Sequence, residues 1–150
     1  AVATLPKTPE SNLASFAQRT AMGIDAERLD REQVIKVRDK FLSDAEKEFV
    51  AADNLEANII AWTAKEALYK AAMTSGLDFK DAIKITSLPK IDRQMNLPGA
   101  PAPVIGTAVI SIPMEEGDAM DVDMNLYSYE SEGHCVTIAF SPKCAKFGRH

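Results

Sequence analysis

The longest unbroken pattern in the sequence runs from Leu55 to Met73, a stretch rich in good helix formers and free of Gly and Pro. It predicts a long helix. One stripe of this helix combines a carboxylate, Glu66, with the apolar residues Leu55, Ile59, Trp62, Tyr69 and Met73. A carboxylate in an apolar stripe is costly unless a cation or hydrogen bonds satisfy it. The other faces are mostly alanine and leucine, which argues against an ordinary surface Glu–Lys pair and predicts a functional Glu66.

Alternating residues from Thr20 to Glu27 predict a strand with two different faces. The residues expected to face the core are Met22, Ile24 and Ala26, and those expected to face the other way are Gly23, Asp25 and Glu27. Residues two apart on a strand share a face, so the two carboxylates point into one volume and repel each other. A hard divalent cation such as Mg²⁺ removes this conflict. A lone Asp-x-Glu is more often a solvated strand face, so the interpretation needs a third carboxylate.

Shorter helices are predicted between the strand and the long helix. Asp30 can cap a helix that has an apolar inner face (Val34, Val37, Phe41) and a basic outer face (Arg31, Lys36, Arg38, Lys40). The basic face is either an ordinary solvated face or a docking patch for an acidic partner. The run from Ser43 to Glu46 matches a capping box and predicts a further helix through Phe49 and Val50.

After the long helix the pattern changes to that of strands. The predicted strands are Asp81–Thr86, Val104–Ile112, Val122–Tyr129 and His134–Phe140, with a Pro- and Gly-rich loop over Ser87–Pro103. The short spacing of the last three favours an antiparallel meander. The fold class predicted is therefore α+β, with one long helix packed on a mostly antiparallel sheet. We expect a single domain over residues 1–150, with a loop at 1–19, a core at 20–140 and a polar tail at 141–150.

The net charge and the residue content of the chain narrow the classes of binding partner and the cellular location that we expect. A net charge of −5 argues against a nucleic-acid binder and against attraction to anionic membranes, so an anionic ligand needs a local group of cations. There is no bilayer-spanning apolar run and no signal-peptide pattern. Cys135 and Cys144 lack Cys-x-x-Cys spacing and are typical of reduced thiols, which indicates a cytoplasmic protein. His134 and Cys135 are strand neighbours that face opposite ways, so they are not a nucleophile pair, and His150 is interpreted as a surface residue.

If the long helix packs on the strand that carries Asp25 and Glu27, Glu66 completes a set of three carboxylates suited to Mg²⁺. Lys65 and Lys70 flank Glu66 and are predicted to hold phosphate oxygens. This combination indicates attack on a pyrophosphate, in which positioning and charge neutralisation supply most of the catalysis. Motifs for P-loop, dinucleotide-binding and serine-hydrolase sites are absent from the sequence.

Two motifs in this order carry a family resemblance. Gly23-Ile24-Asp25-Ala26-Glu27 resembles the G-[IV]-D-x-E element of the 4'-phosphopantetheinyl transferase superfamily. Trp62-Thr63-Ala64-Lys65-Glu66-Ala67-Leu68-Tyr69-Lys70 resembles its W-[ST]-x-K-E-[AS]-x-x-K element. Between them, Phe41-Leu42-Ser43-Asp44-Ala45-Glu46 is similar to the F-[FL]-S-x-x-E segment. The resemblance covers about Gly23 to Met73, roughly a third of the chain.

The resemblance implies an enzyme that transfers the phosphopantetheine arm of coenzyme A to a serine of an acyl or peptidyl carrier protein. It implies Mg²⁺ bound by Asp25, Glu27 and Glu66, and phosphate contacts from Lys65 and Lys70. By the same resemblance, Glu66 helps to deprotonate the carrier serine, Lys70 is catalytic as well as phosphate-binding, and Glu46 has a metal-water or base role.

The sequence departs from the two-lobed type of this family, because no S-x-S-H element precedes Gly23. It resembles the second lobe of that type, so we expect either a missing first lobe or a second copy of the chain that supplies the same surface. Two alternatives stay open. One is a non-catalytic domain of the same fold that binds a carrier protein or a partner lobe. The other is a Mg²⁺-dependent nucleotide hydrolase that uses the same acids.

Overall fold

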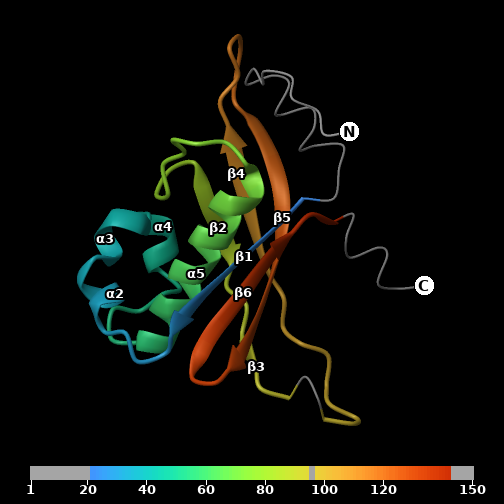
Figure 1. Ribbon diagram of the computed structural model, residues 1–150. Helices are drawn as coiled ribbons and strands as arrows, with labels where there is room; N and C mark the ends of the chain where they lie inside the picture. The colour runs from blue at the N-terminus through green and yellow to red at the C-terminus, as the bar shows by residue number, and fades with distance from the viewer. Residues whose placement is uncertain (1–20, 95–96, 143–150) are drawn as a thin grey trace.

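The computed structural model describes residues 21–94 and 97–142. Figure 1 shows a sheet with all the described helices on one side of it. The helices are α2 (Gln33–Lys36), α3 (Arg38–Phe41), α4 (Asp44–Lys47) and α5 (Leu55–Ala72). The strands are β1 (Met22–Arg28), β2 (Ile83–Ser87), β3 (Ile91–Asp92), β4 (Gly106–Ile112), β5 (Met120–Ser131) and β6 (His134–Phe140).

The sheet has the order β1-β6-β5-β4-β2, and each of these neighbouring pairs is antiparallel. The expected meander of β4, β5 and β6 is therefore confirmed, as is the α+β class. The short strand β3 lies within the segment predicted as a loop, and it pairs parallel with β5 at Ser128 and Tyr129. Its two residues are too few to produce a recognisable alternation, which explains why the sequence pattern does not reveal it.

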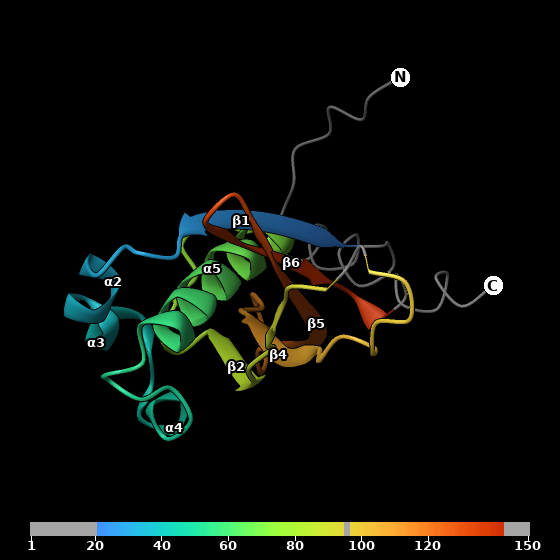
Figure 2. The same ribbon diagram turned by 90° about the horizontal axis from the view of Figure 1, so that it is seen from below.

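Helix α5 is the centre of the core. Asn54 caps it by accepting a hydrogen bond from the Ala57 N–H, and Met73 ends it in the left-handed conformation with φ 53°. Figure 2 shows α5 lying along the sheet, with β1 on one side and β2 on the other. Its alanine-rich faces are fully buried, and Figure 1 shows the small helices on the side of α5 away from the sheet.

Two members of the apolar stripe of α5, Trp62 and Tyr69, contact aromatic side chains. Trp62 contacts Phe41 of α3 with ring centroids 5.1 Å apart, and Phe79, in the α5–β2 connection, lies 5.1 Å from Tyr69. The C-terminal member of the stripe, Met73, is 55% exposed. The stripe thus extends from the fully buried Ile59 to the exposed Met73, and Glu66 on it is half-buried.

The predicted orientation of β1 is wrong. Gly23 is buried and faces α5, whereas Met22 and Ile24 are 59% and 49% exposed on the other face of the sheet, and Ala26 is exposed too. The physical reason is close packing. A Cβ on Gly23 would lie 2.1 Å from the Ala67 carbonyl oxygen and 2.7 Å from the Ala71 nitrogen, so only glycine lets the strand approach the helix this closely.

The basic helix predicted after Asp30 is split into α2 and α3 at Val37. Its inner residues Val34 and Phe41 are buried as predicted. Arg38 does not belong to the outer face, because it donates to Asn58 Oδ1 at 3.0 Å and to the Val50 carbonyl. The predicted capping box at Ser43 and Glu46 is confirmed, although α4 ends at Lys47.

Several expectations lie outside the described residues. They are the loop at 1–19, the polar tail from 143 onwards, and the interpretations of Cys144 and His150. None of the helices in the described ranges combines the length and the apolar character that a bilayer crossing needs.

Candidate functional site

The fold brings the three predicted acids to one region. Asp25 and Glu27 lie on the face of β1 that packs against α5, and Glu66 comes from α5 itself. The pKa of Glu66 is raised above its usual value, first by burial and then by the negative charge of Asp25; Lys70 opposes the shift and Glu27 adds to it. Burial and like charge both disfavour the ionised carboxylate. The contributions of Asp25 and Glu27 to the raised pKa of Glu66 therefore indicate that the two strand carboxylates lie near it.

Cations from the same region neutralise the two acids of β1. Lys70 Nζ lies 2.9 Å from Asp25 Oδ1 and also donates to the Ile24 carbonyl at 3.1 Å. Arg31 Nη1 lies 2.6 Å from Glu27 Oε2, and the Arg28 backbone N–H donates to Glu27 Oε1 at 3.0 Å. No ion pair of Glu66 is found within residues 21–94 and 97–142. Glu66 is thus the least compensated of the three carboxylates.

The described part of the chain contains no group of three or more His, Cys, Asp or Glu side chains arranged around a metal position. The ion pairs explain this, since Asp25 is paired with Lys70 and Glu27 with Arg31, and the two carboxylates do not converge on one position. The donor set nevertheless suits Mg²⁺, which prefers carboxylate oxygens and retains several waters. The Mg²⁺ site remains a prediction.

Lys65 and Glu46 are not brought to these acids. Lys65 is fully buried, and its Nζ donates to Glu46 Oε1 at 2.9 Å, to the Phe79 carbonyl at 2.5 Å and to the Ile83 carbonyl. Glu46 is 2% exposed and accepts from the Ser43 N–H at 2.8 Å and the Ile85 N–H at 2.7 Å. Burial lowers the pKa of Lys65, against the effect of Glu46.

This arrangement does not support the predicted roles of Lys65 in phosphate binding and of Glu46 as a base. The three ammonium protons of Lys65 all have acceptors within the protein. Successive helical residues also point about 100° apart, so adjacency to Glu66 in sequence does not give Lys65 the same direction. The pair instead ties α4, α5 and β2 together.

The structure adds residues that the sequence patterns did not single out. Arg31 is the partner of Glu27, although its place on a basic helix indicated a solvated or docking role. Thr63 and Thr137 meet in a buried hydrogen bond between α5 and β6. A signal for Thr63 was present, since it is a polar residue on the alanine-rich side of α5. No signal marked Thr137, because threonine is common in strands.

Cys135 and His134 behave as expected from strand alternation. Cys135 is fully buried and His134 is exposed. Burial raises the pKa of the Cys135 thiol, while hydrogen bonds from neighbouring hydroxyls act against that rise. A raised pKa disfavours the thiolate, so Cys135 is a poor nucleophile.

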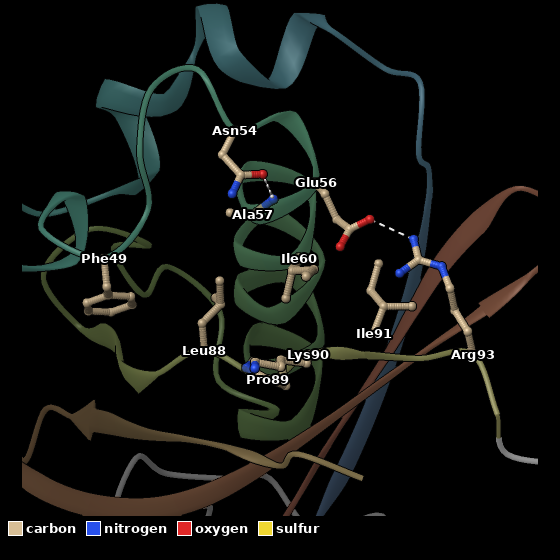
Figure 3. A pocket seen from close by; sticks show the side chains of 10 residues that line it. All are labelled: Phe49, Asn54, Glu56, Ala57, Ile60, Leu88, Pro89, Lys90, Ile91 and Arg93. Carbon is tan, nitrogen blue, oxygen red and sulfur yellow. Dashed lines mark hydrogen bonds and ion pairs between the residues drawn. The ribbon is translucent and has the colours of Figure 1, made fainter. Parts of the chain in front are cut away.

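A pocket of about 460 Å³ lies near the N-terminal end of α5, next to the segment that contains β3 (Figure 3). Its apolar lining includes Phe49, Ile60 and Leu88, and an ion pair of 2.6 Å joins Glu56 and Arg93 at its edge. The acids of β1 and Glu66 do not line it. The pocket is therefore separate from the carboxylate site.

Comparison with known proteins gives one assignment. The family model described as "4'-phosphopantetheinyl transferase superfamily" matches residues 21–106, which include β1, α5 and all three acids. No curated protein matches the chain.

Proposed function

Because the chain belongs to the 4'-phosphopantetheinyl transferase superfamily, we propose that it transfers the 4'-phosphopantetheine arm of coenzyme A to a serine of an acyl or peptidyl carrier protein. The observation that supports this proposal is that β1 turns the face with Asp25 and Glu27 toward α5, where burial and then the charge of Asp25 raise the pKa of Glu66. Glu66 is poorly suited to a purely structural role, because it has no ion pair among the described residues and the charges of Asp25 and Glu27 oppose its own.

In this proposal Asp25, Glu27 and Glu66 hold Mg²⁺. Their oxygen-only chemistry and their mutual repulsion both fit a hard divalent cation. When bound, the ion supplies positive charge to the pyrophosphate of coenzyme A. In the structure, Lys70 and Arg31 neutralise the acids of β1. Once Mg²⁺ neutralises those acids, both cations would be available to bind phosphate oxygens.

Lys70 is the residue we assign to the coenzyme A phosphates. Its side chain is 52% exposed, so its ammonium group can reach a ligand in solution. It also lies 2.9 Å from Asp25, which places a cation at the edge of the acid group. A Lys in this position serves as a point charge for phosphate oxygens. Lys65 has no part in this contact, since it is fully buried.

Glu66 is the residue we assign to the proton of the carrier serine. The serine oxygen forms a bond to the phosphorus that bears pantetheine, and the bond from that phosphorus to the bridging oxygen breaks. The electron pair leaves with 3',5'-adenosine bisphosphate, and the serine proton passes to the Glu66 carboxylate. An ionised carboxylate in this position can act as a general base for the serine hydroxyl.

Exposed lysines on the small helices that follow β1 in the chain suit an acidic partner. Lys36 of α2 and Lys40 of α3 are exposed, and they follow β1 closely in the chain. Arg31 and Arg38 contribute less to such a surface, because Glu27 holds the first and Asn58 and Val50 hold the second. We propose that the carrier protein docks over Lys36 and Lys40.

The test is to incubate the protein with coenzyme A, Mg²⁺ and several apo carrier proteins, and to weigh the carriers by mass spectrometry. The expected result is a gain of one phosphopantetheine group. Glu66→Gln should abolish this gain, while Glu56→Gln, the same change on the same helix at the Arg93 ion pair, should leave it. No gain with any carrier, or full activity of the Glu66 variant, would overturn the proposal.

A further inference from the structure

A chain of buried hydroxyl groups crosses from the sheet to α5. Thr137 Oγ1 of β6 lies 2.8 Å from Ser128 Oγ of β5 and 2.8 Å from Thr63 Oγ1 of α5. All three side chains are fully buried. Cys135 Sγ lies 3.6 Å from Thr63 Oγ1 and 3.7 Å from Thr137 Oγ1.

The donor and acceptor roles of these buried hydroxyl groups are fixed. Thr63 Oγ1 donates to the carbonyls of Ile59 and Ile60, at 2.9 and 3.0 Å, and carbonyl oxygens can only accept. A hydroxyl has one proton, so Thr137 must donate to Thr63, and Ser128 must donate to Thr137. A movement of α5 along or around its axis would leave a buried donor without an acceptor, which is unfavourable. The hydroxyl groups therefore add a directional constraint on the position of α5 to the non-directional one of its apolar contacts.

The hydroxyl chain lies beside the carboxylate site. In the β1–β6 register Thr137 is opposite Asp25, and Cys135 is opposite Glu27. Residues opposite each other in antiparallel strands have Cβ atoms about 4.5–5.5 Å apart. On α5, Thr63 precedes Glu66 by about one turn. The hydrogen bond from Thr137 to Thr63 thus links the strand neighbour of Asp25 to the helical turn before Glu66.

We propose that Thr137 and Thr63 are positioning residues that set the separation of Glu66 from Asp25 and so make the site select Mg²⁺ over Ca²⁺. The inference rests on the proposed Mg²⁺ site. Mg²⁺ requires nearly ideal octahedral geometry with oxygens about 2.0–2.1 Å away, whereas Ca²⁺ accepts flexible geometry at about 2.3–2.6 Å. A small increase in the freedom of α5 therefore weakens Mg²⁺ binding more than Ca²⁺ binding.

The experiment is calorimetric titration of the metal-free protein with MgCl₂ and separately with CaCl₂. Thr137→Val keeps the shape and removes the hydroxyl, whereas Thr137→Ser keeps the hydroxyl. Thr107→Val is the matched control, because Thr107 Oγ1 makes a similar hydrogen bond of 2.7 Å to Thr86 Oγ1 on the exposed side of the sheet. The expected result is an about tenfold weaker Mg²⁺ affinity for Thr137→Val with Ca²⁺ affinity little changed.

Thr137→Ser and the control Thr107→Val should keep the ratio of Mg²⁺ affinity to Ca²⁺ affinity that the unmodified protein has. If Thr137→Val does not fold, Thr63→Val is titrated in its place, with the same expectation. A ratio unchanged in the valine variant, or changed equally in Thr107→Val, overturns the positioning role and leaves the proposed function standing. Absence of Mg²⁺ binding by the unmodified protein overturns both.

Discussion

Glu66 is unfavourable to the folded protein when it is ionised. Burial and the charge of Asp25 both raise its pKa, and the cation nearby, Lys70, is already paired with Asp25. The folded protein therefore holds the Glu66 proton more tightly than the unfolded chain does. The contribution of Glu66 to stability is complete at low pH and is lost as the pH rises through its folded-state pKa.

Replacing Glu66 by Gln should for this reason stabilise the metal-free protein at neutral pH. The neutral amide resembles the protonated carboxyl, so the variant avoids the loss that the ionised side chain causes. We expect a higher melting temperature than that of the unmodified protein at pH 7, and no difference below about pH 3, where Glu66 is protonated in both states. Calorimetric melting across this range, in EDTA, measures it. A difference that does not depend on pH would contradict the explanation.

The Lys65–Glu46 pair allows a second prediction about single residues. Both charges are buried, so Lys65→Met should destabilise the fold by about 3–5 kcal/mol, because it leaves Glu46 without its cation. The double variant Glu46→Leu with Lys65→Met should regain part of this loss, since buried ion pairs can be exchanged for apolar residues. Urea unfolding measures both effects.

The same double variant also tests the site. If Lys65 is structural, coenzyme A should bind the folded double variant with the affinity of the unmodified protein, while Lys70→Ala should bind it more weakly. Calorimetric titration with coenzyme A in Mg²⁺ compares them. Loss of binding by the double variant, with its fold intact by circular dichroism, would return Lys65 to the phosphate contacts.

At the level of elements, the contact between β1 and α5 decides whether the acids meet. Gly23→Ala would put a carbon 2.1 Å from the Ala67 carbonyl oxygen, and helix backbone cannot move aside as a flexible side chain can. We expect a loss of at least about 1–3 kcal/mol in the free energy of unfolding, and weaker Mg²⁺ binding in whatever folds. Ala26→Val, which adds carbon on the exposed face of the same strand, should have little effect. Equal stability of the two variants would contradict this account.

Much of this arrangement could be predicted from sequence, because it depends on local patterns. The capping box at Ser43, the length of α5 and the meander of the last three strands all follow from periodicity and turn residues. The three acids could be singled out because two lie on one strand face and the third interrupts an apolar stripe, and their binding of Mg²⁺ stays a prediction.

The errors arose where a contact between distant segments decides the outcome. Met22 and Ile24 were assigned to the core because apolar residues usually are buried, but β1 turns the face with Gly23 toward α5. The surroundings of Lys65 were also not foreseen: its ammonium group contacts Glu46, which is 19 residues away in the chain, and its contact with phosphate stays a prediction. Neither partner can be identified from spacing alone, since both contacts depend on how the layers pack.

At the scale of the whole molecule, negative charge opposes the binding of the proposed substrate. The chain carries a net charge of −5, yet the proposed substrate is a polyanion that must approach three carboxylates. Mg²⁺ and coenzyme A should therefore each raise the affinity of the protein for the other. The cation reduces the repulsion between coenzyme A and the carboxylates, and the phosphates of coenzyme A supply oxygen ligands to the cation. Only binding to the folded protein raises its stability, so a shift in the melting temperature reports this coupling.

We expect coenzyme A to raise the melting temperature clearly in Mg²⁺ and very little in EDTA. A ligand present at about 100 times its dissociation constant stabilises the fold by about 2.7 kcal/mol, which thermal unfolding detects easily. In Glu66→Gln, the effect of coenzyme A should be small with or without Mg²⁺, whereas Glu56→Gln should respond as the unmodified protein does. If coenzyme A stabilises the protein equally in EDTA, its phosphates are held by cationic side chains alone and the three acids have another role.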